Sequence, residues 1–234
     1  MTDFPLNPLL SEETLARRDI LPRKPEAVVL RGKRIRLQPL ELARDIPPLF
    51  ARSNGQPASL GTHSIEAYDA DQLIWRYMSA GPFADEDGLR AWLGTQVETP
   101  DTLALSVYDI DTDSLIGVTN LMSNNPQHLS IELGNIWYSP LVQKTGVNTE
   151  AIYLMLNHVF NLGYRRVIWK CDALNTRSRR SALRLGFQFE GIHEQHLIVK
   201  GRNRDTAWFR ILDNEWDAVR QQLEARLEAR SGLS

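Results

Sequence analysis

The order of apolar patterns between residues 130 and 199 restricts what this chain can fold into more than any other feature of its sequence. Residues 130–138 have a strand pattern, and apolar residues then recur at helical spacing from Gly146 to Leu162, up to Gly163. The patterns that follow predict a strand at Arg165 to Cys171, a helix at Asn175 to Leu185 and a strand at Phe187 to Val199. This alternation predicts an α/β fold (mixed α+β) with a sheet flanked by helices.

The rest of the chain adds antiparallel strands and further helices. Short polar turns join the predicted strands at Leu103 to Asp109, Leu115 to Ser123 and Ser130 to Tyr138, which indicates an antiparallel meander. One earlier strand is expected from Val28 to Leu37, broken near Gly32, and a late one from Asp205 to Leu212. Helices are expected at Glu41 to Arg52, Asp69 to Met78 and Asp85 to Val97. The central sheet is therefore predicted to be mostly antiparallel.

The chain is long enough for one substantial core, so a single domain is expected. Several prolines around a polar stretch set residues 1–25 apart as an N-terminal arm with one short helix. Residues 26–213 are predicted to form the domain. Residues 214–234 are predicted to form an amphipathic helix that packs on or beside it.

Composition excludes several classes of function. The formal net charge of −2 gives no general attraction to nucleic acid, and a stretch of 18 apolar residues, as a membrane span needs, does not occur. The single cysteine, Cys171, excludes an internal disulfide and any site with several cysteines, and the five histidines show no ligand spacing. We therefore expect a cytoplasmic protein without a metal, a nucleic-acid partner or a membrane partner.

The segment Gln143 to Thr149 joins the end of a predicted strand to the start of a predicted helix. A helix N-terminus presents unpaired backbone N–H groups and the positive end of the helix dipole, which together suit a pyrophosphate. Thr145, Asn148 and Thr149 are placed to cap the helix or to donate to phosphate oxygens, and Gln143 and Lys144 add side-chain donors. An ordinary capped helix after a turn has the same pattern.

Gln143, Gly146 and Asn148 fall on the positions of the Gln/Arg-x-x-Gly-x-Gly/Ala signature of the GNAT acetyltransferases, with Asn148 in place of the usual small residue. Other segments agree in order and spacing: Ile131-Glu132-Leu133-Gly134, Asn175-x-x-Ser178, Leu185-Gly186-Phe187 and Phe189-Glu190-Gly191. Over about residues 30–213 the chain resembles the RimJ/RimL-like branch of that superfamily, whose founding members acetylate the N-termini of ribosomal proteins.

The resemblance implies that acetyl-CoA is the cosubstrate and that its pantetheine arm lies between strands 130–138 and 165–171, which separate there. Backbone groups of Ile136, Trp137 and Tyr138 would then bind the pantetheine amides. Gln143, Lys144, Thr145, Gly146, Val147, Asn148 and Thr149 would surround the pyrophosphate. Asn175 would lie near the thioester while also capping its helix, and Arg180 would reach the 3′-phosphate.

Acetyl transfer to an amine requires an unprotonated amine and a proton for the departing thiolate. The resemblance indicates Glu132 as the general base, with Glu194, His196 or a water chain as alternatives, and Ser178 as the proton donor. A backbone N–H of strand 130–138 would polarise the thioester carbonyl. Trp75, Tyr77, Phe83 and Trp92 are expected mostly in the core, with one or two lining the amine pocket.

Two other functions remain compatible with parts of this sequence. The same fold could serve as a non-catalytic module that binds or senses acyl-CoA. A Rossmann-type nucleotide-binding protein is disfavoured, because no strand is followed by Gly-x-Gly-x-x-Gly and the early connections are too short for parallel crossovers. The acceptor is expected to be a small amine or a protein N-terminus, and a homodimer is compatible with the sequence.

Overall fold

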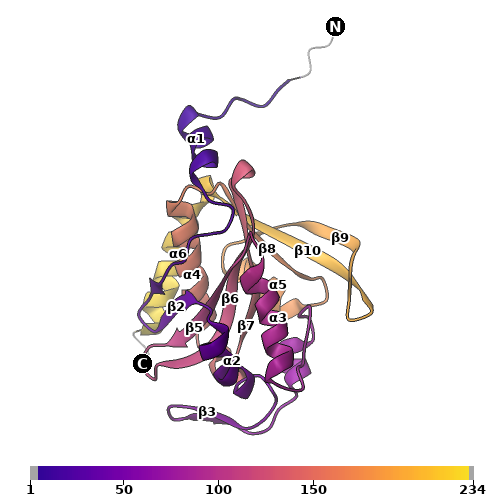
Figure 1. The fold of residues 1–234 in the computed structure, drawn as a ribbon. Coiled ribbons are helices and arrows are strands. Elements are labelled where there is room, and N and C mark those ends of the chain that lie inside the picture. Colours follow the sequence, from indigo (N-terminus) through magenta and orange to yellow (C-terminus); the bar gives the residue numbers. More distant parts are fainter. Residues whose placement is uncertain (1–4, 232–234) are drawn as a thin grey trace.

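An eight-stranded sheet forms the centre of the protein in the computed structural model, which describes residues 5–231 (Figure 1). In spatial order its strands are β1 (Leu30–Arg31), β2 (Ile35–Pro39), β5 (Leu103–Asp109), β6 (Ser114–Asn125), β7 (Ser130–Tyr138), β8 (Arg166–Asp172), β10 (Arg202–Leu212) and β9 (Gln188–Val199). Neighbouring strands are antiparallel except β7 and β8, which are parallel. The mostly antiparallel mixed sheet predicted from the sequence is therefore confirmed.

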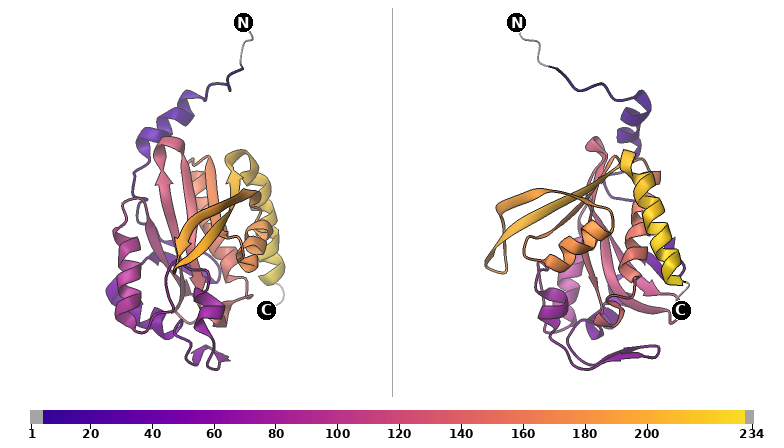
Figure 2. Two further views of the ribbon diagram at one scale, coloured as in Figure 1. Left: turned by 90° about the vertical axis from the view of Figure 1, so that its right-hand side faces the viewer. Right: turned by 180° about the vertical axis from the view of Figure 1, so that it is seen from behind.

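The two faces of the sheet carry separate hydrophobic cores. One core lies under α4 (Val147–Asn161), α5 (Thr176–Arg184) and α6 (Asp213–Ser231), and the other under α2 (Leu42–Ala51), the π-helix η1 (Asp71–Trp75) and α3 (Glu86–Glu98). Strand β6 shows how one strand serves both, because Ile116 and Leu121 belong to the first core while Leu115 and Val118 belong to the second. Figure 2 shows the two helical layers with the sheet between them.

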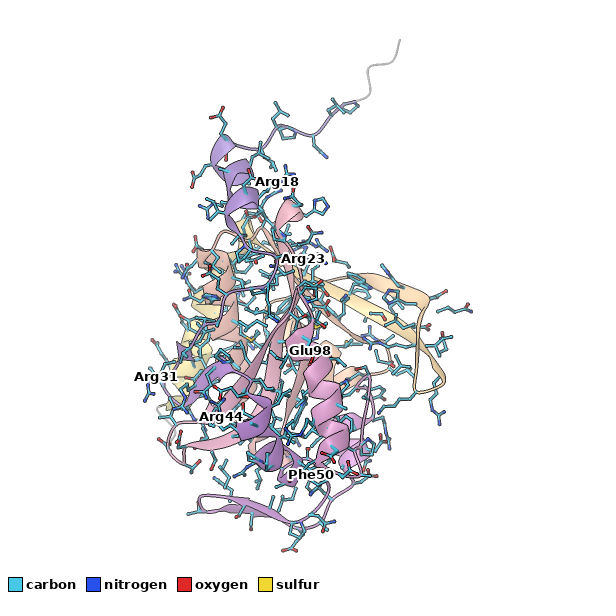
Figure 3. The ribbon with its side chains drawn as sticks, viewed as in Figure 1. Arg18, Arg23, Arg31, Arg44, Phe50 and Glu98 are labelled. Atoms are coloured by element: carbon cyan, nitrogen blue, oxygen red, sulfur yellow. The ribbon has the colours of Figure 1, made fainter. Side chains whose placement is uncertain are left out.

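The terminal segments pack against the edges of this arrangement. Helix α6 lies on α4, where Trp216 stacks on Phe160 with ring centroids 5.0 Å apart and the Tyr153 hydroxyl donates to Glu224 at 2.8 Å. Helix α1 (Glu12–Ile20) lies at one end of the molecule, and its Arg18, labelled in Figure 3, donates to Gln127 at 2.8 Å. Gln127 belongs to the 3-10 turn η2 (Pro126–His128) between β6 and β7.

Three details differ from the sequence expectation. The single strand expected from Val28 to Leu37 is a hairpin of β1 and β2, whose turn at Gly32 leaves room for the Glu150 side chain, with which a Cβ at this position would collide. The helix expected from Asp69 to Met78 is the short π-helix η1. A small hairpin of β3 (Ala58–Leu60) and β4 (His63–Ile65) was not predicted, because three-residue strands are too short for an alternation to stand out.

Candidate active site

Strands β7 and β8 pair only at their beginnings, where Ser130, Ile131 and Glu132 lie opposite Arg166, Val167 and Ile168. Beyond that point β7 contains a bulge, because Asn135 and Ile136 together oppose a single residue of β6, and Asn135 has a φ of +50°. The bulge bends β7, and its later backbone, from Ile136 to Tyr138, has no strand partner on the β8 side. The separation of these two strands, predicted from the resemblance, is confirmed.

The loop after β7 leads through a 3-10 turn, η3 (Pro140–Val142), to the N-terminus of α4. Lys144 and Gly146 both have left-handed backbone conformations, with φ values of +67° and +103°. The amides of Thr149 and Glu150 donate to the Gly146 carbonyl, so the amides of Val147 and Asn148 are the ones that the helix leaves without an intrahelical acceptor. These two donors at the positive end of α4 fit a bound phosphate.

Contacts with distant segments hold this loop in shape. The Arg34 guanidinium donates to the Thr145 carbonyl at 3.0 Å, and the Thr145 hydroxyl donates to the Val142 carbonyl at 2.7 Å. The side-chain amide of Gln143 donates to the backbone carbonyl of Leu73, in η1, at 3.2 Å. The loop residues named from the sequence therefore lie together at the N-terminus of α4. Gln143 also joins the loop to the helical layer on the opposite face of the sheet.

Asn148 replaces the small residue of the signature, and its side chain points toward α5 rather than into the loop. Its side-chain amide donates to the Ser181 hydroxyl at 3.0 Å, which ties the first turn of α4 to α5. Thr149, directly after it, is buried. The Asn148 side chain thus holds two helices together. The backbone amides of Val147 and Asn148 still lack an intrahelical acceptor, as at any helix N-terminus.

Helix α5 begins with the cap predicted from the sequence, since the Asn175 side chain accepts from the Ser178 amide at 3.0 Å. The Ser178 hydroxyl accepts from Trp169 Nε1 at 3.0 Å and so keeps its own hydrogen to donate. In this structure the neighbouring acceptor is the Cys171 thiol, whose pKa is raised by burial and lowered in part by Ser178.

The arginines of α5 divide into two groups. Three of them form hydrogen bonds within the chain: Arg177 with the carbonyls of Gln72 and Leu73, Arg179 with the Ala173 carbonyl and Arg184 with the Ser181 hydroxyl. Arg180 is exposed and makes no hydrogen bond or ion pair with any residue that the structure describes. Arg180 is therefore the arginine of this helix whose donors are available to a ligand.

Glu132 lies at the last β7–β8 pair, where the two strands begin to separate. It is 5% exposed, and its Oε2 lies 2.6 Å from Lys170 Nζ and 3.2 Å from the Ser123 hydroxyl, which donates to it. No residue between 5 and 231 donates to Oε1. Burial raises the pKa of Glu132, and Lys170 and Ser123 oppose part of that rise. One oxygen is thus anchored while the other is available.

The alternative bases lie farther out, on the β9–β10 hairpin, which extends beyond the rest of the sheet in Figure 2. Glu194 is exposed. His196 is exposed as well, and its Nδ1 lies 2.9 Å from the Thr206 hydroxyl. Desolvation is the main cause that lowers the pKa of His196, and the charge of the nearby His193 lowers it further. The ring of His196 is therefore neutral near pH 7. Neither residue shares the burial of Glu132 at the start of the gap.

The aromatic residues between the first strands form one cluster with β7. Trp75 is fully buried and makes edge-on contacts with Phe83 and Trp92, at centroid distances of 5.1 and 5.7 Å, and it lies 5.0 Å from Trp137. Tyr77 is half-buried nearby in the sequence. The core role expected for most of these residues is confirmed for Trp75.

The sequence did not single out Lys170, Ser123 or Arg34. Lys170 and Ser123 occupy ordinary polar positions of strands, and Arg34 lies in the turn between β1 and β2. The role of each depends on contacts with another segment. Within residues 5–231 no group of three or more His, Cys, Asp or Glu side chains is arranged to hold a metal ion. No described helix has both the length and the apolar content that a membrane crossing requires.

Known proteins share this fold and sequence. The Acetyltransferase (GNAT) domain family matches residues 34–188. A GCN5-related N-acetyltransferase from Brucella melitensis is 39% identical, with a TM-score of 0.76 and coverage of 86% of each chain. A GNAT-family acetyltransferase from Chromobacterium violaceum is 35% identical, with a TM-score of 0.77 and coverage of 93% of this chain and 99% of its own.

A curated relative extends the comparison to a characterised enzyme. The ribosomal-protein-serine acetyltransferase of Escherichia coli (strain K12) is 30% identical over 105 residues, which is 44% of this chain. The chain spans 58% of the length of that relative. The chain belongs to the GNAT acetyltransferase family.

Proposed function

We propose that the protein transfers the acetyl group of acetyl-CoA to a primary amine, by direct attack of the amine on the thioester within a ternary complex. The acceptor is a protein N-terminus or a small amine. The name of the Escherichia coli relative, which specifies a serine of a ribosomal protein, supports a protein acceptor and a cytoplasmic location. The observation that carries the proposal is the position of Glu132, anchored through Oε2 where β7 and β8 separate.

Cosubstrate binding is assigned to the loop and to the free edge of β7. The amides of Val147 and Asn148 at the start of α4 would donate to the pyrophosphate, with Gln143, Lys144, Thr145, Gly146 and Thr149 around it. The backbone of Ile136, Trp137 and Tyr138, which has no strand partner on the β8 side, would bind the pantetheine amides, and Asn175 would lie near the thioester. Arg180, with donors available on α5, is assigned to the 3′-phosphate.

The chemistry needs two proton transfers. Glu132 Oε1 takes a proton from the amine, because its raised pKa brings this carboxylate closer to the pH at which a general base works best. The amine nitrogen then bonds to the acetyl carbon and the carbon–sulfur bond breaks. Ser178 gives a proton to the departing thiolate by turning its hydroxyl hydrogen away from Cys171. Ser178 then regains a proton from solvent, and Glu132 releases to solvent the proton that it took from the amine. The product is the N-acetylated amine, and CoA leaves with a thiol.

The test is a panel of amines with acetyl-CoA, in which release of free CoA is measured for the wild type and for Glu132→Gln. The variant should lose turnover by about 10² to 10⁴-fold, the usual contribution of a general base, and should recover at high pH, where the amine deprotonates without help. Its affinity for CoA, measured by calorimetry, should stay the same. Ser178→Ala should reduce turnover less, because water can protonate the thiolate.

Glu194→Gln is the matched control, since it changes the exposed alternative base in the same way. The protein would instead be a binding or sensing module if the wild type bound acetyl-CoA but released no free CoA with any amine. Wild-type turnover and an unchanged pH profile in Glu132→Gln would transfer the role of base to Glu194, His196 or a water chain.

A further inference from the structure

Lys170 reaches across the start of the gap between β7 and β8. It lies two residues beyond Ile168, the last residue of β8 that pairs with β7. Its ammonium nitrogen is 2.6 Å from Glu132 Oε2, and the two side chains are 23% and 7% exposed. A mostly buried ion pair therefore stands at the place where the proposed transfer occurs.

Trp208 fixes the direction of the lysine. It is the direct neighbour of Lys170 on β10, and the Lys170 nitrogen lies 4.7 Å from the centre of its ring. The indole also contacts His193, whose ring is stacked on it at a centroid distance of 4.7 Å and an interplanar angle of 30°. This stack holds the ammonium toward Glu132 rather than toward solvent.

Other groups around Glu132 do not replace this contact. Ser123 of β6 supplies a neutral hydroxyl at 3.2 Å, and Arg204 of β10 acts on Glu132 through its charge without a hydrogen bond. His196, on β9, acts on Lys170 and Arg204 in the same long-range way. Among the residues described, Lys170 is thus the cation in direct contact with the carboxylate, and burial alone would favour the protonated acid.

We propose that Lys170 is a positioning residue for acetyl transfer, which keeps Glu132 ionised and orients Oε1 toward the acceptor amine. The proposal rests on the role of Glu132 proposed above. The ion pair uses Oε2, so the carboxylate cannot rotate without breaking it, and the proton from the amine arrives at the other oxygen. The charge of the lysine thereby serves the base without entering the reaction.

The test compares Lys170→Met, Lys170→Gln and Lys170→Arg by the pH dependence of kcat/KM. Met and Gln remove the charge while keeping a long side chain over Trp208, and the acid limb of the profile should then move up by about one pH unit or more. Turnover should fall near neutral pH while the KM for acetyl-CoA stays the same. Arg keeps a positive charge and should restore most of the wild-type profile.

A second measurement, the pH dependence of the free energy of unfolding, applies even if the uncharged variants are less stable. Without Lys170 the pKa of buried Glu132 rises further above its value in the unfolded chain, so the free energy of unfolding should fall as pH increases through that interval. Adding Glu132→Gln to Lys170→Met should abolish this pH dependence. Lys170 would have only a structural role if the uncharged variants kept the wild-type acid limb while Glu132→Gln still lost turnover. If Glu132→Gln itself kept full activity, the assignment of Glu132 as the general base would fail instead, and acetyl transfer would proceed with another base.

Discussion

Arg34→Met tests whether the cofactor loop depends on a contact that lies outside it. The Arg34 guanidinium, in the turn between β1 and β2, donates to the Thr145 carbonyl at 3.0 Å. In a trans peptide the carbonyl oxygen and the next N–H point in opposite directions, so this bond turns the Gly146 N–H away from Arg34. Gly146 has a φ of +103°, a region in which glycine has several alternatives, so the orientation of this peptide needs an external restraint.

The expected effect follows from the strength of one hydrogen bond. A net contribution of about 0.5 to 1.5 kcal/mol corresponds to a roughly 2- to 13-fold weaker binding of acetyl-CoA. The contact is exposed, which places the expected value toward the lower end. Turnover at saturating acetyl-CoA should not change, because Arg34 contacts the loop and not the groups proposed to react.

Isothermal titration calorimetry with acetyl-CoA, together with KM and kcat, provides the assay. Arg36→Met is the matched control: Arg36 lies two residues further on, in β2, pairs with Asp113 at 3.0 Å and lies 4.8 Å from the centre of the Tyr108 ring. Unchanged affinity in a folded Arg34→Met variant, or an equal loss in Arg36→Met, would refute the idea that Arg34 orients the loop.

Three further predictions concern stability and binding. Asp45 is fully buried, and burial acts to raise its pKa. Hydrogen bonds from Arg44, Ser106 and Tyr108 outweigh burial, so the pKa of Asp45 is lowered. Asp45→Asn should therefore reduce the free energy of unfolding by roughly 3 to 5 kcal/mol near pH 7, measured by urea unfolding. That cost should shrink as pH falls through the lowered pKa, where the wild type loses the same interaction, and a constant difference would contradict it. Gly117→Ala should cost about 1 to 3 kcal/mol in the same assay, because the new Cβ would collide with the Trp137 carbonyl, and a neutral result would show that β6 and β7 can separate locally. Acetyl-CoA at about 100 times its dissociation constant should stabilise the protein by roughly 2.7 kcal/mol in a thermal-shift titration, and no increase would contradict the assigned cosubstrate.

Local patterns predicted the elements that carry the site. Strand β7 and β5 have the predicted bounds, and α4 lies within one residue of prediction, because alternation and helical spacing persist over many residues there. The Asn175 cap of α5 was also predicted, since the capping residue and the amide it satisfies are three residues apart. The π-helix η1 was predicted only as a helix, because the difference between the two hydrogen-bond patterns has no clear signal in five residues.

The environment of each reacting group could not be predicted in the same way. The sequence indicated Glu132 through a resemblance, but Lys170 and Ser123, which determine the charge and orientation of its carboxylate, reach it from different strands. The bulge at Asn135 likewise follows from the register between β6 and β7, which depends on how the two strands pair over their whole length.

The sequence by itself determined the order of strands and helices, the helix N-terminus that suits a phosphate and the family resemblance, because each depends on residues that are close neighbours in the chain. The tertiary structure alone decided which cation accompanies Glu132, where β7 and β8 separate, and how Arg34 holds a loop 111 residues away. The physical reason is that hydrogen bonds and ion pairs act over a few ångströms in space. Residues far apart in the sequence reach that distance only after the sheet has set their register.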